Sequence, residues 1–164
     1  MKRKSYTAIC LTRGAMVAAM YVALTYLSFL FGLSGGVIQF RISEALCVLP
    51  IFFPEAILGL TVGCVISNLV TGAAVWDIIF GSIATLIGAV GARLFKKLPK
   101  KFIFIATLPT LFANAIIIPF VLIFAYGIEG GYWFFFLTVG IGELVCATIG
   151  GTLIYYGLRK LRLK

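Results

Sequence analysis

Long apolar runs separated by short polar breaks dominate the chain. Six runs can be distinguished, at residues 7–31, 41–53, 56–70, 76–94, 102–126 and 132–158. A helix needs about 20 residues to cross a hydrocarbon core of about 30 Å, and only the second and third runs are clearly shorter. The pattern predicts an all-α integral membrane protein, a bundle of six transmembrane helices that forms a single domain over residues 1–164.

Composition supports a membrane protein and excludes several kinds of site. The chain is 62% hydrophobic and 12% charged, whereas soluble domains average about 25% charged residues. It contains no histidine, which excludes triads with a histidine base and HExxH zinc sites. Its four cysteines lie in apolar runs without CxxC spacing, so we expect free, structural thiols and no metal site.

Basic residues mark the sides of the membrane. Thirteen of the fourteen lie in three clusters that border apolar runs, at both ends of the chain and between the fourth and fifth runs. Such clusters are typical of cytoplasmic segments. Six crossings place both termini on one side, so the sequence predicts cytoplasmic N and C termini. The clusters favour lipid head groups over nucleic acid as the partner. The first run is too long for a signal peptide and Arg13 interrupts its start, which favours a retained helix.

Charged and amide side chains inside apolar runs are the first candidates for a site. Arg41 and Glu44 are three residues apart and would share a helical face. They either form an ion pair that fixes a bend or line a cavity that receives a polar solute. Glu143 lies roughly 16 Å into the last run, where a carboxylate costs about 2.5–3.5 kcal/mol, and Asn114 reaches a similar depth. Glu143 either contacts a ligand or is protonated or hydrogen-bonded between helices.

Two segments at the outer ends of the runs combine small residues, an aromatic residue and an acid. They are residues 71–77, with Trp76 and Asp77, and residues 127–133, with Trp133. The two tryptophans either anchor the protein at the membrane interface or stack on a flat ligand. Asp77 either contacts the ligand or caps a helix. Asn68, one turn below the outer end of its run, is a further candidate wall residue.

Small residues recur in the first run. Ala15, Ala19 and Ala23 stand at every fourth position, a spacing that lets helices approach closely. The stripe either packs inside the bundle or receives a helix from another protein.

The six-run layout, this alanine stripe, residues 39–46 and the Trp76-Asp77 pair resemble the substrate-binding S components of energy-coupling-factor (ECF) vitamin transporters. The closest likeness is to the QueT-type queuosine-precursor family. It covers nearly the whole chain, and residues 38–91 are its most specific part. The resemblance implies a subunit of the bacterial cell membrane that captures a micronutrient outside and docks on a shared transmembrane T protein with two ATPases. The docking motif would map onto Ala15 and Ala19, or onto Ala19 and Ala23.

The resemblance also implies a deazaguanine ligand and a pocket near the outer face. One edge of such a base carries an N–H and an amine, which a carboxylate can accept in bidentate fashion. Glu143 is the candidate for this contact, with Asn114 reading the carbonyl group. The remaining candidate wall or stacking residues are Arg41, Glu44, Asn68, Trp76, Asp77 and Trp133.

The chain contains no GxxxxGK[ST] phosphate loop. We therefore expect no cofactor in this subunit and ATP hydrolysis by its partners. A second class of function is a solitary secondary transporter or channel with Glu143 as its proton or ion site. A membrane enzyme is the third class, but no catalytic constellation can be named, so we expect no catalysis.

Overall fold

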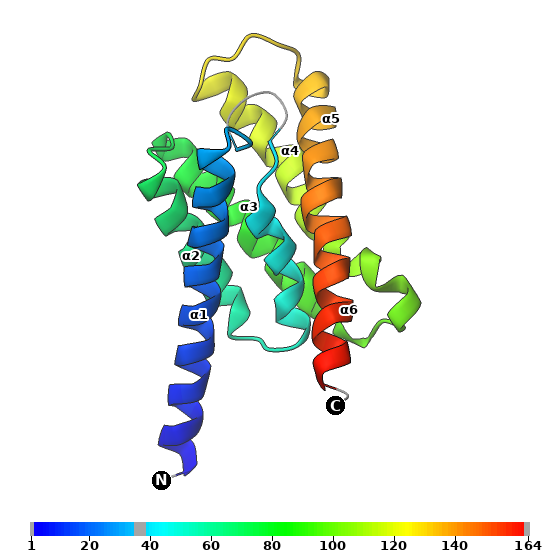
Figure 1. Cartoon of the computed structure of the whole chain (residues 1–164). Coiled ribbons are helices and arrows are strands. Elements are labelled where there is room, and N and C mark those ends of the chain that lie inside the picture. Colours follow the sequence, from blue (N-terminus) through cyan, green and yellow to red (C-terminus); the bar gives the residue numbers. More distant parts are fainter. Residues whose placement is uncertain (1, 35–38, 163–164) are drawn as a thin grey trace.

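The computed structural model describes residues 2–34 and 39–162, and all regular structure in this part of the chain is helical (Figure 1). In chain order the elements are α1 (Lys2–Leu30), η1 (Ile42–Ile51), α2 (Ala56–Val70), α3 (Val75–Leu94), η2 (Phe95–Lys97), η3 (Lys100–Thr107), α4 (Leu108–Phe124), α5 (Tyr132–Glu143), η4 (Leu144–Gly150) and α6 (Gly151–Arg162). The elements η1, η2 and η3 are 3₁₀ helices and η4 is a π-helical stretch. The all-helical class predicted from the sequence is confirmed.

Within residues 2–34 and 39–162, four helical stretches are long and apolar enough to cross a membrane: Tyr6–Leu30, Val75–Lys97, Lys100–Phe124 and Tyr132–Leu161. The two shorter apolar helices are η1 and α2. At about 2 Å per residue, the ten residues of η1 extend about 20 Å, less than the hydrocarbon core. The start of α1 and the end of α6 lie at the same end of the bundle (Figure 1), as expected when the chain reverses direction at each run.

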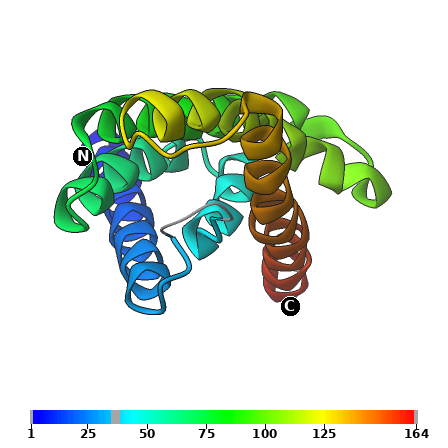
Figure 2. The same cartoon turned by 90° about the horizontal axis from the view of Figure 1, so that it is seen from above.

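Seen along the bundle, α2, α3 and α4 form an arc, with α1 and α5–α6 at its two ends (Figure 2). The short helix η1 lies inside this frame and packs against α1, α3, α6 and η4. Its eight residues 43–50 are all buried, because protein surrounds the element on every side. The short apolar run at residues 41–53 thus lies at the centre of the fold.

Glycines permit close contacts between neighbouring helices. A Cβ atom at Gly63 of α2 would lie 2.9 Å from the Cβ of Tyr21 on α1. One at Gly88 of α3 would lie 2.8 Å from the Cα of Thr110 on α4. These backbones therefore approach each other more closely than alanine would allow, which is how small residues stabilise helix pairs in membranes.

Candidate functional site

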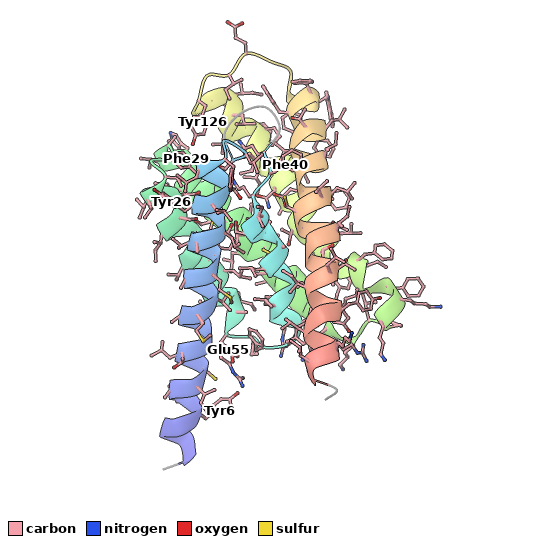
Figure 3. The ribbon with its side chains drawn as sticks, in the orientation of Figure 1. Tyr6, Tyr26, Phe29, Phe40, Glu55 and Tyr126 are labelled. Carbon is pink, nitrogen blue, oxygen red and sulfur yellow. The ribbon has the colours of Figure 1, made fainter. Side chains whose placement is uncertain are left out.

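A polar cavity of about 260 Å³ lies at the end of the bundle opposite to the start of α1 and the end of α6, in the region of Phe29 and Tyr126 (Figure 3). Its size is near the lower limit for ligand pockets, which fits a small solute. Helices α1, α2, α3 and α4 and the segments that follow α1, α2 and α4 all contribute to its wall. The lining residues are Thr25, Phe29, Ser34, Gln39, Arg41, Asn68, Thr71, Gly72, Ala73, Asp77, Leu122, Tyr126 and Ile128.

The charged centre of the cavity is an ion pair between Arg41 and Asp77. The Arg41 Nη2 atom lies 3.1 Å from Asp77 Oδ2 and 3.4 Å from Oδ1. Both residues are largely withdrawn from the surface, with 8% and 4% of their areas exposed. A buried ion pair is tolerated only when further hydrogen bonds satisfy its remaining atoms. The neighbours of the pair provide such bonds.

Asn68 and Gly81 complete the surroundings of this pair. The Asn68 side-chain amide donates to the backbone carbonyl of Asp77 at 3.2 Å. One turn further along α3, a Cβ atom at Gly81 would lie 3.2 Å from Asp77 Oδ1, 3.3 Å from Asn68 Nδ2 and 3.6 Å from Arg41 Nη1. The side chains of Asp77, Asn68 and Arg41 therefore converge at Gly81, which has no side chain of its own.

Tyr126 bridges two segments at the edge of the cavity. Its hydroxyl donates to Asp77 Oδ2 at 3.0 Å and accepts the backbone N–H of Ala74 at 3.1 Å. Partial burial, and to a smaller extent the Asp77 carboxylate, raises the pKa of the phenol, although the Ala74 N–H acts in the opposite direction. The phenol therefore stays protonated at neutral pH and holds the segment before α3 to the end of α4.

Three of the sequence candidates, Arg41, Asn68 and Asp77, line this one cavity. Sequence reasoning did not single out Thr25, Gln39 or Tyr126, which also line it. Tyr126 directly precedes Gly127, whose φ of 63° turns the chain. An aromatic residue at such a turn is a signal that could have drawn attention to it.

The ion pair considered between Arg41 and Glu44 is corrected by the structure, in which Arg41 pairs with Asp77. Arg41 precedes η1 and has an extended backbone, with φ −94° and ψ 94°, so the two side chains do not share a helical face. Glu44 accepts hydrogen bonds from the Tyr21 hydroxyl, from Thr85 Oγ1 at 3.4 Å and from the Cys47 thiol at 3.1 Å. It lies in the core and not in the cavity wall.

Glu143 and Asn114 are buried on α5 and α4, outside the cavity lining. Glu143 Oε2 has no hydrogen-bond partner among the described residues. Asn114 Nδ2 donates to the Thr110 carbonyl at 3.1 Å. The preceding residue of α5, Gly142, packs directly against the backbone carbonyl of Gln39, so Glu143 follows a residue that contacts the cavity wall.

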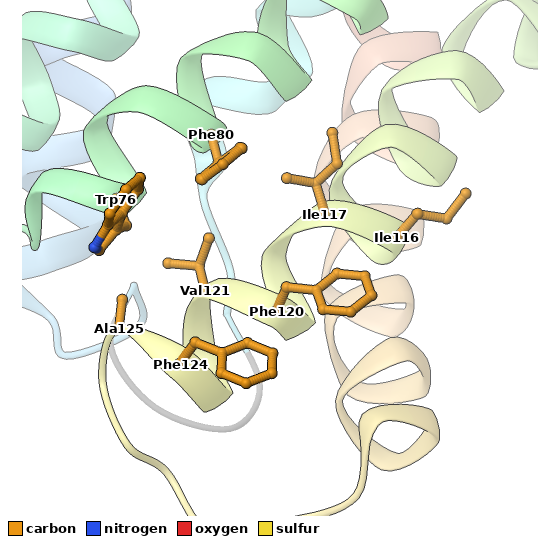
Figure 4. Close-up of a pocket in the computed structure, with 8 residues that line it drawn as sticks. All are labelled: Trp76, Phe80, Ile116, Ile117, Phe120, Val121, Phe124 and Ala125. Atoms are coloured by element: carbon orange, nitrogen blue, oxygen red, sulfur yellow. The ribbon is translucent and has the colours of Figure 1, made fainter.

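Both tryptophans lie outside the polar cavity. Trp76 stacks on Phe80, with ring centroids 5.9 Å apart, and lines a separate hollow of about 380 Å³ with an apolar wall (Figure 4). Trp133 is exposed at the start of α5 and contacts Tyr132 and Phe136 edge to face. A polar solute needs hydrogen-bonding groups around it, and these are found in the cavity of Arg41 and Asp77.

The alanine stripe lies on the outside of the bundle. Ala15, Ala19 and Ala23 are exposed and line a shallow groove of about 820 Å³ between α1 and α2. Val62 and Ile66 of α2 form part of its other wall. Of the two interpretations of the stripe, the structure therefore favours an outward surface over packing inside this chain.

Comparisons with known proteins agree on one family. The family model described as "QueT transporter" matches residues 11–160. The "Queuosine precursor transporter QueT" of Lactococcus lactis subsp. cremoris (strain MG1363) is 41% identical over 86 residues, which are 52% of this chain and 48% of the relative. The match thus spans about half the length of that relative. No solved structure matches the chain.

Proposed function

The chain belongs to the QueT transporter family, and from this premise we propose that it is the solute-binding subunit of an uptake system for a queuosine precursor. Its four long apolar helices make it a multi-pass membrane protein. We assign it to a bacterial cell membrane, with six crossings and both termini in the cytoplasm. The proposed solute is a deazaguanine, because the curated relative is named for queuosine precursors.

The observation that carries the proposal is the buried polar cavity around Arg41 and Asp77. Arg41 contacts Asp77 through one terminal nitrogen, Nη2, so the other N–H groups of its guanidinium do not bind this carboxylate. A guanidinium N–H can donate to the carbonyl group of a deazaguanine. Asn68 and Gln39 add amide groups to the same wall, and Phe29 and Tyr126 add aromatic rings. The cavity therefore combines hydrogen-bonding groups with flat apolar surface, as a purine-like base requires.

We propose that Glu143 accepts the N–H and amine edge of the base and that Asn114 reads its carbonyl group. Neither side chain lines the cavity, so the base would have to reach them past the Gln39 backbone that packs against Gly142. Asp77 already accepts hydrogen bonds from Arg41 and Tyr126, whereas Glu143 Oε2 has no partner among the described residues. An unsatisfied buried acceptor costs about 1–3 kcal/mol or more if it is charged. A ligand that supplies two donors would remove this penalty.

Partner subunits complete the proposal. The α1–α2 groove with Ala15, Ala19 and Ala23 would receive a transmembrane T protein, since its small side chains let a foreign helix approach closely. Two ATPases bound to that protein would hydrolyse ATP. The family is named for transport, and we propose no catalysis by this chain.

The proposal is tested by calorimetric binding of deazaguanine bases to the purified full-length chain, with riboflavin, thiamine and biotin as comparison solutes. We expect saturable binding of a deazaguanine and none of the other three. Asn68→Ala should weaken binding about tenfold, because it removes an amide from the wall and the hydrogen bond that positions Asp77. Glu129→Gln, an exposed residue of the loop before α5, is the matched control and should bind normally. A folded chain that binds no deazaguanine would refute the proposal.

A further inference from the structure

The connection between α3 and α4 projects from the side of the bundle, at the end where α1 begins and α6 ends (Figure 1). We define the basic elbow as residues 94–104, which include η2 and the first half of η3. The view along the bundle shows the same projection beyond α5–α6 (Figure 2). The candidate spans Val75–Lys97 and Lys100–Phe124 meet in this segment, which places it at a boundary between membrane and water.

Four lysines lie within six residues of the elbow, at positions 96, 97, 100 and 101, and all four are exposed. The ion pairs among the described residues are Arg13–Glu55 and Arg41–Asp77, so no acidic side chain of this part of the chain neutralises the lysines. The elbow itself contains no Asp or Glu. It therefore presents a local charge that only a partner or solvent ions can balance.

Apolar side chains accompany these lysines. Leu94, Phe102 and Phe104 are exposed, with 76%, 41% and 43% of their areas accessible. The Lys101 ammonium lies 4.9 Å from the centre of the Phe102 ring. A lysine side chain at a membrane surface can extend its ammonium group to the head groups while apolar side chains beside it contact the acyl chains. The basic elbow thus exposes positive charges and apolar side chains next to each other.

The elbow is fixed to the bundle by contacts on its inner side. Ile103 is buried with Val48 and Tyr155. The Tyr156 hydroxyl donates to the Lys100 carbonyl at 3.0 Å. At its base, Arg93 donates to the carbonyls of Pro50 and Ile51 at 2.9 and 3.2 Å. The backbone before and after the lysines is therefore held in place before any partner binds.

We propose that the basic elbow is a binding site for anionic phospholipid. The lysines bind the phosphate and the acidic head group, and the acyl chains lie against Phe102 and Phe104. Charge complementarity selects this occupant, because lysines at a membrane surface are attracted to anionic lipids and not to zwitterionic ones. The site joins the ends of α3 and α4 opposite to those that carry the cavity residues Asp77 and Leu122, and it does not depend on which solute the protein binds.

The test uses the purified full-length chain in detergent with equal amounts of phosphatidylglycerol and phosphatidylcholine, and counts retained lipids by native mass spectrometry. We expect the wild type to retain phosphatidylglycerol with about tenfold preference. The variant K96Q/K97Q/K100Q/K101Q should reduce the preference to near parity, and the conservative variant with arginine at all four positions should keep it. Soluble glycerol phosphate should not displace the lipid, because it lacks acyl chains.

A control variant with the same change in net charge distinguishes a lipid site at the basic elbow from general attraction of anionic lipid to a positively charged protein. The variant K2Q/R3Q/K4Q/K164Q removes four positive charges elsewhere in the sequence and should keep the wild-type preference. The proposal is overturned if both glutamine variants lose the preference equally, if neither loses it, or if glycerol phosphate competes as well as lipid. Should the quadruple elbow variant not fold, K96Q/K97Q and K100Q/K101Q are compared separately, and unchanged preference in both would refute the site.

Discussion

At the scale of single residues, Gly81 determines how closely three polar side chains approach. A methyl group at this position would contact Asp77, Asn68 and Arg41 at 3.2–3.6 Å. We predict that Gly81→Ala weakens solute binding about tenfold, because overpacking a tight site costs about 1–3 kcal/mol. Calorimetry on the purified variant measures the effect. Gly157→Ala on α6 is the control, since nothing lies within 4 Å of that position, and unchanged affinity in both variants would contradict the assigned cavity.

Glu143 gives a second prediction at this scale. We expect Glu143→Gln to weaken deazaguanine binding more than tenfold, because an amide presents one acceptor oxygen where the carboxylate presents two. Thermal unfolding of the ligand-free variant should be unchanged or shifted upward, since the buried Oε2 atom has no partner to lose. Normal affinity together with a lower melting temperature would instead show that Glu143 has only a structural role.

Sequence reasoning found Arg41 because a charged side chain in an apolar run must face the interior or a wet cavity. It found Asp77 and Asn68 from their positions at or near the outer ends of apolar runs. It considered an ion pair of Arg41 with Glu44 as one of two alternatives and did not find the pair with Asp77, since spacing describes neighbours along a helix but not contacts between elements. Arg41 has an extended backbone, and its partner is 36 residues away. Gly81 carried no signal for the same reason: its role depends on side chains that converge from other elements.

At the scale of elements, the sequence predicted the position of the short central helix η1 but not its helix type or its exact ends. The apolar run at residues 41–53 ends before Pro54 and contains Pro50, which cannot donate a backbone hydrogen bond. The structure shows the 3₁₀ helix Ile42–Ile51. Continuous apolar sequence indicates burial on all sides, and η1 is indeed surrounded by α1, α3, α6 and η4. Helix type and exact ends depend on these tertiary contacts.

The outer face of α1 is the surface at which we expect a partner helix to dock. Ala19→Trp would fill the groove between α1 and α2, where Ala19 is exposed and lies outside the core. We predict that solute affinity is unchanged while co-purification with the T protein and ATPases falls at least about tenfold, because helix association in membranes depends on close approach. Leu153→Trp, at an exposed position of α6, is the control. Equal recovery of the partners with both variants would argue against docking at this groove.

At the scale of the whole molecule, composition and run lengths were enough to predict a helical membrane bundle. Four stretches reach spanning length in the structure, while η1 and α2 are shorter. Counting apolar runs does not establish six crossings, because a short apolar helix enclosed by longer ones has the same composition as a span. The resemblance implied a pocket near the outer face, but the full set of wall residues was beyond sequence reasoning, since the wall is built from several segments that meet only in the fold.

A binding subunit and a solitary transporter differ in whether this chain alone can accumulate the solute. The only buried arginine in the described chain is paired with Asp77, whereas Glu143 is buried without such a pair and would be the proton site of a solitary transporter. In proteoliposomes that contain this chain alone, we predict that labelled deazaguanine binds but does not accumulate under an imposed proton gradient. Accumulation should require the T protein, the ATPases and ATP. Accumulation by the chain alone that Glu143→Gln abolishes would assign the solute to a proton-coupled pathway and make the partner subunits unnecessary.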